Sequence, residues 1–177
     1  WNLDRRLDKD MAQACALAGG IAAAKAGATF IVDHHSSPNA VSGSLDIIAA
    51  ALDEIGLSHL LCVELSDRDG WAKREAGYIE TDRYLRKRQG LVGLHASFTV
   101  GDDLLERAVA LADKHGTGIH IHVAEAVDDE KDCIRRHGMR VVQRLARAGA
   151  LRSSKTLLAH GLHLDAKERA LLRCNPA

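Results

Sequence analysis

The sequence predicts an α/β protein built on a parallel sheet. Five short apolar segments fit buried strands, and a segment with helical spacing separates each strand from the next. Only a helical crossover returns a parallel strand to the same sheet, so this alternation favours parallel strands covered on both faces. An open doubly wound sheet and part of a (β/α)8 barrel both fit the pattern, and in both the functional residues gather at the carboxyl ends of the strands.

The elements follow one another without a linker. We expect a first helix from Leu7 to Ala26, where small and apolar residues recur at helical spacing and Gly27 supplies the stop. No Pro/Gly/Ser-rich or low-complexity stretch interrupts the chain, so one domain over residues 1–177 is the simplest division. The further helices are expected over 44–56, 70–88, 102–116, 127–148 and 166–172, and the strands over 28–33, 59–65, 91–98, 118–125 and 156–164.

Composition restricts the class of function. The 24 basic and 24 acidic residues cancel, so nothing indicates the concentrated basic surface that nucleic acid or an anionic membrane requires. No apolar run is long enough for a membrane span, and no basic-then-apolar leader opens the chain. The four cysteines are far apart in sequence and read as reduced core residues. We therefore expect a cytoplasmic protein that acts on a small molecule.

Titratable residues concentrate where the expected strands end. Convergent imidazoles and carboxylates make a plausible site for a divalent metal such as zinc or iron. A lone histidine in such a place is more often structural, and we favour that interpretation for His34 and His35, with Asp33 holding the loop that follows. Seven of the ten histidines lie on the predicted rim: residues 34, 35, 95, 120, 122, 160 and 163.

Clustering favours a function for His95, His122, Glu125 and His160. In "GIHIHVAE" (118–125) two histidines alternate with isoleucine, so both face the same side of a regular strand. His122 lies nearer the carboxyl end, where a barrel site would be. His120 lies about 6 to 7 Å deeper and is expected to support the site or pack beside it.

Three motifs in order resemble the amidohydrolase superfamily of metal-dependent (β/α)8 hydrolases, within its deaminase and chlorohydrolase branch. They are "GLHASFT" (93–99), "HIHVAE" (120–125) and "TLLAHGLHL" (156–164). With "DHHSSPNAVSGSLDIIAAAL" (33–52) and "LSDRDG" (65–70), the chain is most similar to aminohydrolases associated with selenium metabolism.

The resemblance implies a role for each candidate residue. His122 is implied as a metal ligand, Glu125 as the group that shuttles protons, and His160 as the residue that polarises the leaving or reacting group. His95 matches a position near bound substrate. The segment "CNPA" (174–177) is similar to a seventh-strand motif that begins with histidine in the family, whereas this chain has Cys174 there.

The family also carries a paired histidine motif on the first barrel strand and an aspartate on the eighth. The segments of this chain match strands two to seven, and its only HxH pair is that of His120 and His122. We therefore expect an incomplete TIM barrel, an internal part of a longer protein, with residues 1–177 forming a partial metal-dependent hydrolase domain.

The favoured hypothesis is an enzyme with one divalent metal, zinc with iron as the alternative. It hydrolyses carbon–nitrogen bonds other than peptide bonds, deaminating a small nitrogen heterocycle through a metal-activated water. Alternatives are a chlorohydrolase-type reaction, or an inactive fragment or scaffold whose incomplete site lacks the metal. A flavodoxin-like binding module is disfavoured because no glycine-rich phosphate loop follows the first strand. A homodimer is compatible with the resemblance.

Overall fold

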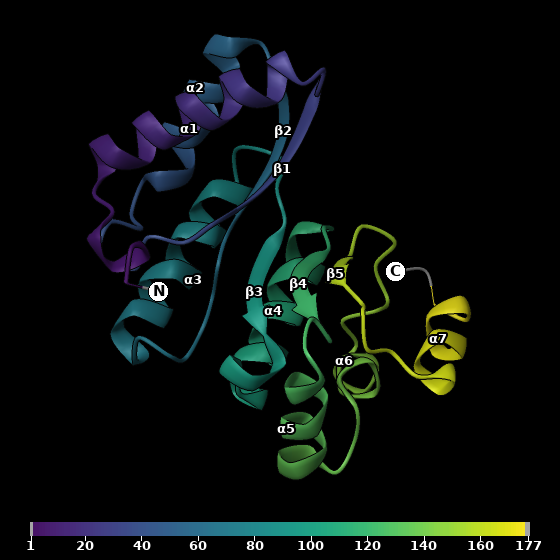
Figure 1. Ribbon diagram of the computed structural model, residues 1–177. Helices are drawn as coiled ribbons and strands as arrows, with labels where there is room; N and C mark the ends of the chain where they lie inside the picture. Colours follow the sequence, from purple (N-terminus) through teal and green to yellow (C-terminus); the bar gives the residue numbers. More distant parts are fainter. Residues whose placement is uncertain (1, 176–177) are drawn as a thin grey trace. The chain divides into compact units, whose positions relative to one another are not determined.

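The computed structural model describes residues 2–175 and divides the chain into two compact units (Figure 1). Of the described residues, the first comprises 2–64 and 69–90, and the second comprises 65–68 and 91–175. Every strand pairing among the described residues is parallel. The predicted α/β class with parallel strands is therefore confirmed.

The first unit contains a two-stranded sheet in which Phe30 pairs with Ser58 and His35 pairs with Val63. Its first helix begins after Asp8, whose carboxylate accepts a hydrogen bond from the backbone N–H of Met11 at 2.8 Å. This is an N-cap contact of the usual kind. In chain order the unit consists of the 3-10 helix η1 (Asp4–Arg6), α1 (Lys9–Lys25), β1 (Phe30–His35), α2 (Ser44–Ile55), β2 (Ser58–Val63) and α3 (Trp71–Leu85).

The helices α1 and α2 pack closely because Gly20 lies between them. A Cβ atom at this position would lie only 2.6 Å from Cδ1 of Ile55 and 3.0 Å from Cδ2 of Leu52. The rest of the unit's core joins the apolar face of α2 to β2, where Leu61 and Cys62 are fully buried.

The strand β1 differs from the prediction in two ways. It runs two residues later than expected, so His34 and His35 belong to the strand itself. It was also expected to be buried, but Phe30 is 50% exposed and Val32 is 38% exposed. The reason is that β1 is an edge strand, with β2 as its sole partner among residues 2–175.

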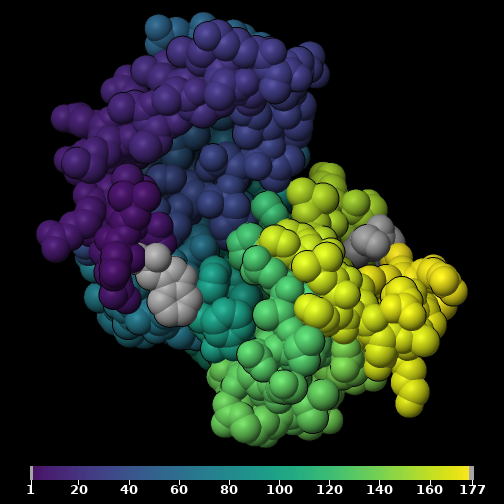
Figure 2. Space-filling view, viewed as in Figure 1, coloured from purple at the N-terminus to yellow at the C-terminus, as the bar shows by residue number. Residues whose placement is uncertain are grey.

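The second unit contains a three-stranded sheet with β4 in the middle. The helix α4 packs against β3 and β4, and α6 packs against both α5 and α7. Figure 2 shows the C-terminal part of the chain, coloured yellow, at the surface of this unit. The elements are β3 (Val92–Ala96), the 3-10 helix η2 (Ser97–Thr99), α4 (Asp102–His115), β4 (Ile119–Val123), α5 (Val127–His137), α6 (Val141–Ala148), β5 (Leu157–His160) and α7 (Ala166–Arg173).

The expected strands of the second unit are all shorter than predicted, and one expected helix is divided. The helix expected over 127–148 is two helices, because Gly138 adopts a left-handed φ of 69° and ends α5. Where α6 begins, the backbone N–H of Arg140 donates to Oε1 of Gln143 at 3.1 Å. The strand expected over 156–164 stops at His160, since the positive φ angles of His160 and Gly161 turn the chain away from the sheet.

The cysteines are all reduced, as expected for Cys15, Cys62, Cys133 and Cys174, but only two belong to the core. Cys62 and Cys133 are buried, whereas Cys15 is exposed because α1 buries little beyond Ala12 and Gly20. Of the segment 174–177, Cys174 is exposed after α7, and the last two residues lie outside the described residues. None of the helices described combines the length and the apolar character needed to cross a membrane.

Candidate active site

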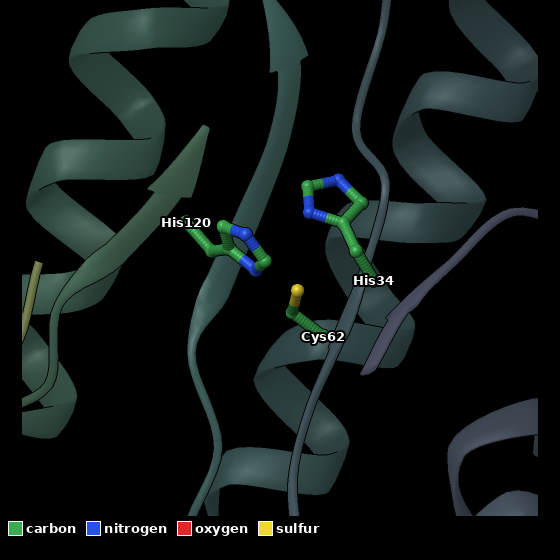
Figure 3. A group of neighbouring side chains, drawn as sticks. All are labelled: His34, Cys62 and His120. Carbon is green, nitrogen blue, oxygen red and sulfur yellow. The ribbon is translucent and has the colours of Figure 1, made fainter. Parts of the chain in front are cut away.

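Two histidines of β4 share one face of its sheet. Ile119, Ile121 and Val123 are buried on the side that α4 covers, whereas His120 (Figure 3) and His122 alternate with them and are half-buried. Their ring centroids lie 6.2 Å apart. The prediction that both histidines face the same side is therefore confirmed.

His160 ends the neighbouring strand beside His122. In the parallel register His160 pairs with Val123, and Ala159 pairs with His122. The backbone of His160 has a φ of 73°, which is uncommon for a residue with a side chain and is typically found at functional sites. Its Nε2 lies 3.2 Å from Nδ1 of His122, so the two rings share one hydrogen bond.

Glu125 lies directly beyond the strand and close to the same ring. Its Oε2 is 3.7 Å from Nε2 of His160, and its side chain is 63% exposed. The turn that presents it contains Ala124 with a φ of 48°. The buried Asp129 holds this turn, because its Oδ2 accepts a hydrogen bond from the backbone N–H of Ala124 at 2.9 Å.

The third strand brings His95 to the same group. Leu94 pairs with Ile121 and Ala96 pairs with His122, so His95 is the extra residue of a bulge in β3. Bulges of this kind redirect a side chain. The His95 ring lies edge-on to His122, with centroids 5.7 Å apart.

The electrostatics favour neutral imidazoles at His120 and His122. Burial lowers the pKa of His120 to about 4, helped by repulsion from His122 and His160. Burial and the neighbouring His160 also lower the pKa of His122, against the opposing effect of Glu125. An imidazole must be neutral to bind a metal through a ring nitrogen, and this environment meets that requirement at neutral pH.

A pocket opens directly on these residues. It has a volume of about 420 Å³, within the range of pockets that hold small organic ligands. Phe98 supplies an aromatic wall, and His122 and Glu125 supply reactive groups. The other lining residues are Ala96, Ala126, Asp128, Asp129 and Asp132.

The first unit presents its own set of donor groups at the carboxyl ends of β1 and β2. His34 pairs with Cys62 across the two strands (Figure 3), and potential ligand atoms of His34 lie within 4.8 Å of those of Cys62 and of Glu64. His35 fits the structural interpretation, since its Nε2 lies 2.7 Å from Oγ of Ser37 and the ring is buried. His34, in contrast, stands among possible metal ligands.

Asp33 does not hold the following loop as expected. Its Oδ1 is buried without a hydrogen-bond partner, and burial raises the pKa of its carboxyl group. The loop is held instead by the contact of Ser37 with His35 and by a hydrogen bond from Ser36 Oγ to Oε1 of Glu64 at 3.2 Å.

The second unit offers part of the ligand set of a zinc site. Zinc in a catalytic site takes about three protein ligands, usually histidine nitrogen or carboxylate oxygen, and leaves a position open for water. His122 offers a neutral imidazole of this type, while Glu125 stands beside it with an exposed carboxylate. The remaining ligands implied by the sequence resemblance, an HxH pair on a first strand and a final aspartate, have no counterpart in the order of this chain.

Three supporting residues escaped the sequence-based prediction. Asp129 supports the turn before Glu125, and Thr99 lies 2.6 Å from Nδ1 of His95. Arg144 is 2% exposed and bonds to the loop that follows β3. A signal for Arg144 exists, because it falls three residues after Val141 on the otherwise apolar face of α6.

Comparison with known proteins places these residues in a family context. A family model described as "Amidohydrolase family" matches residues 1–175. The 5'-deoxyadenosine deaminase of Methanopyrus kandleri is 34% identical over 97% of this chain, which corresponds to 40% of that protein. The 8-oxoguanine deaminase of Pseudomonas aeruginosa is 27% identical over 80% of the chain and 36% of that protein. The chain thus spans about 40% of the length of the curated relatives it matches.

Solved structures share the fold. An adenosine deaminase from Xanthomonas campestris with bound zinc superposes with a TM-score of 0.83 over 99% of this chain and 40% of its own, at 21% identity. A triazine hydrolase from Arthrobacter aurescens superposes with a TM-score of 0.80 over 99% of this chain and 43% of its own, at 15% identity. The partial coverage of both structures agrees with the prediction of an incomplete barrel.

Proposed function

Because the chain belongs to the amidohydrolase family, we propose that the whole protein is a metal-dependent deaminase. It hydrolyses a carbon–nitrogen bond other than a peptide bond, replacing the amino group of a small nitrogen heterocycle by oxygen from water and releasing ammonia. The observation that carries this proposal is the convergence of His122, His160 and Glu125 at the ends of two adjacent strands, with contacts of 3.2 and 3.7 Å.

The proposed roles follow from the positions of these side chains. His122 holds the metal through a neutral ring nitrogen. Glu125 takes a proton from the attacking water and delivers it to the departing amine, which requires a carboxylate beside the metal rather than bound to it. His160 stabilises the charge that develops on the attacking oxygen by hydrogen bonding. His95, on the third strand, contacts the substrate.

Zinc is the metal that we propose, with iron as the alternative. A bound zinc ion lowers the pKa of a water molecule from 15.7 to about 7 and so supplies a nucleophile at neutral pH. Imidazole and carboxylate donors suit this ion. Family membership supports a divalent metal in general terms.

The relatives indicate the substrates to test. Two of them are named for deamination of 5'-deoxyadenosine and 8-oxoguanine, both of which are purine compounds. A structural neighbour is described as an atrazine chlorohydrolase. The same water-activating chemistry would displace chloride from a ring carbon, so a chlorohydrolase reaction is the alternative to deamination.

The test uses the full-length polypeptide expressed with zinc. We expect about one metal ion per chain by elemental analysis, together with ammonia release from at least one amino-substituted purine or pyrimidine. Chloride release from atrazine without ammonia release would favour the alternative reaction. A folded full-length protein that holds no metal and turns over none of these compounds would support the scaffold hypothesis and refute the proposal.

Variants separate the proposed roles. His122→Ala should lose both the metal and turnover. Glu125→Gln should keep the metal while turnover falls about 10²- to 10⁴-fold, the usual contribution of a general acid–base. His163→Ala is a matched control, because His163 is exposed and comes from the same turn as His160.

Three further features belong to this proposal. We propose that residues 1–177 are one part of a single barrel domain, that the protein works in the cytoplasm, and that it forms a homodimer. The balanced charge of the chain and its four reduced cysteines support the cytoplasmic assignment and argue against a nucleic-acid partner.

A further inference from the structure

The hydroxyl group of Thr99 contacts both a backbone carbonyl and the ring of His95. Thr99 Oγ1 donates to the backbone oxygen of Ala96 at 3.1 Å and lies 2.6 Å from Nδ1 of His95. A hydroxyl group has only one proton to donate but two lone pairs to accept with. A carbonyl oxygen can only accept, so both contacts can be hydrogen bonds at once only if the hydroxyl donates to Ala96 and Nδ1 of His95 donates to the hydroxyl.

We propose that Thr99 is a positioning residue that fixes His95 in the tautomer protonated at Nδ1. Nε2 of His95 then carries a lone pair and acts as a hydrogen-bond acceptor. The inference rests on the proposed function in one respect, namely that His95 contacts the substrate. It narrows the substrate class, since the group that meets His95 must be a donor such as a ring N–H, an amino group or a hydroxyl group.

The turn that carries Thr99 is held from two sides, so its hydroxyl has a defined position. Arg144 of α6 donates to the backbone oxygens of Ser97 at 3.0 Å and of Val100 at 2.7 Å. On the other side, the backbone N–H of Asp67 donates to the backbone oxygen of Thr99 at 2.9 Å. The carboxylate of Asp67 also accepts from the N–H of Gly101 at 2.7 Å.

The aromatic neighbours restrict the ring of His95 in addition. Phe98 lies edge-on to it with centroids 5.5 Å apart, and His122 lies edge-on at 5.7 Å. Rotating the ring by 180° would remove Nδ1 from Thr99 and place a carbon there instead. The hydrogen bond therefore selects both the orientation of the ring and the nitrogen that carries the proton.

An unprotonated Nε2 on His95 would favour ligand groups that donate a hydrogen bond over groups that accept one. A ligand group with an N–H or O–H would form a hydrogen bond with Nε2 of His95. A carbonyl oxygen or an unprotonated ring nitrogen at the same place would oppose one lone pair with another and leave both unsatisfied. The site should therefore discriminate between isosteric heterocycles that differ only in the position of a proton.

Nuclear magnetic resonance of the ring nitrogens tests the tautomer directly. The full-length protein is labelled with ¹⁵N-histidine, and long-range ¹H–¹⁵N correlations are recorded at neutral pH, with His95→Gln used to assign the signal. We expect a protonated Nδ1 and an unprotonated Nε2 for His95. Thr99→Val, which keeps the shape but removes the hydroxyl group, should shift the proton toward Nε2, and Thr99→Ser should restore the original pattern.

Kinetics provide a second readout on any substrate identified by ammonia release. Thr99→Val should lower kcat/KM about 5- to 30-fold, mainly through KM, and Thr99→Ser should recover most of the loss. A wild-type His95 protonated at Nε2, or a valine variant with an unchanged tautomer, would overturn the inference. If the valine variant does not fold, the wild-type spectrum alone decides the matter.

The two proposals can fail separately. A protein that releases no ammonia but shows His95 protonated at Nδ1 refutes the proposed function and leaves the role of Thr99 intact. An active deaminase with His95 protonated at Nε2 refutes the role of Thr99 alone.

Discussion

Arg144 anchors the loop after β3 from within the core of the second unit. Its guanidinium group is 2% exposed and donates to the backbone oxygens of Ser97 and Val100 and to the carboxylate of Asp102. Replacing it by methionine keeps an unbranched apolar chain of similar length while removing every donor. We expect Arg144→Met to destabilise this unit more than any other single arginine substitution on α6.

The magnitude follows from the groups left behind. Ser97 and Val100 are each 1% exposed, so their carbonyl oxygens would be buried without the donors they have now, at about 1–2 kcal/mol each. The side chain of Asp102 is 51% exposed, so water can replace the guanidinium there and the additional loss is small. The sum is about 3 kcal/mol, in line with removal of one partner from a buried ionic network.

Hydrogen exchange is the appropriate assay, because it follows the backbone amides of β3 and β4 one by one. A loss of about 3 kcal/mol should reduce the protection of amides in β3 and β4 about 100-fold where exchange occurs by unfolding of the unit. Arg147→Met, at an exposed position of the same helix, is the control and should change protection less than about threefold. Equal effects of the two substitutions would refute this account of Arg144.

The remaining predictions concern backbone fit and one buried acid. Ala124→Gly should raise the free energy of unfolding by up to about 1 kcal/mol. The left-handed backbone at Ala124 costs about 1–2 kcal/mol, and glycine removes that strain at a smaller cost in the conformational entropy lost on folding. Urea denaturation followed by circular dichroism measures the change, and a lower free energy of unfolding would contradict this account. Gly118→Ala should lower the free energy of unfolding by more than about 2 kcal/mol, since the new Cβ would lie 2.2 Å from the backbone carbon of Lys155. Gly19→Ala, with open space around it in α1, should raise the free energy of unfolding by about 0.5–1 kcal/mol. Burial, with the charge of Glu168 adding to it, raises the pKa of Glu130 to about 7, so the folded state binds more protons than the unfolded state and stability should fall as pH rises from about 4.5 to about 7. Glu130→Gln should flatten that part of the pH–stability profile, and an unchanged slope would exclude Glu130 as its source.

The parts of the site that could be predicted from sequence are those that lie within one motif. His122 and Glu125 are three residues apart at the end of an alternating strand, and strand geometry alone places them near one another. The alternation of β4 also separated its buried isoleucines from its histidines correctly. His95 and His160 were predicted from the clustering of titratable residues at the strand ends, and the resemblance implied their roles. The structure brings both rings within 6 Å of the His122 ring, measured between centroids.

The parts that could not be predicted depend on contacts that no local pattern encodes. The side chain of Asp129 accepts from a backbone N–H five residues earlier, across a turn whose left-handed Ala124 gives no compositional signal. The break between α5 and α6 was missed because an isolated glycine such as Gly138 is tolerated within many helical patterns. The burial of β1 was overestimated because an apolar sequence indicates that a strand is covered without identifying the elements that cover it. In the structure Phe30 and Val32 of this strand are exposed.

The residues that support the candidate site are closer in sequence to the side chains they position than those side chains are to one another. His95, His122 and His160 come from three different strands. At the ends of β3 and β4, however, the supporting residues are near in sequence: Thr99 follows His95 by four residues, and Asp129 follows Ala124 by five. The ends of β3 and β4 thus each have a supporting residue nearby in sequence, and the parallel register of β3, β4 and β5 brings the three strand ends together. If Glu125 transfers protons and His95 contacts the substrate, as proposed, both roles depend on side chains that the second unit holds in place. Substitutions at Thr99 or Asp129 should therefore lower kcat/KM at constant metal content, whereas His122→Ala should lose the metal as well.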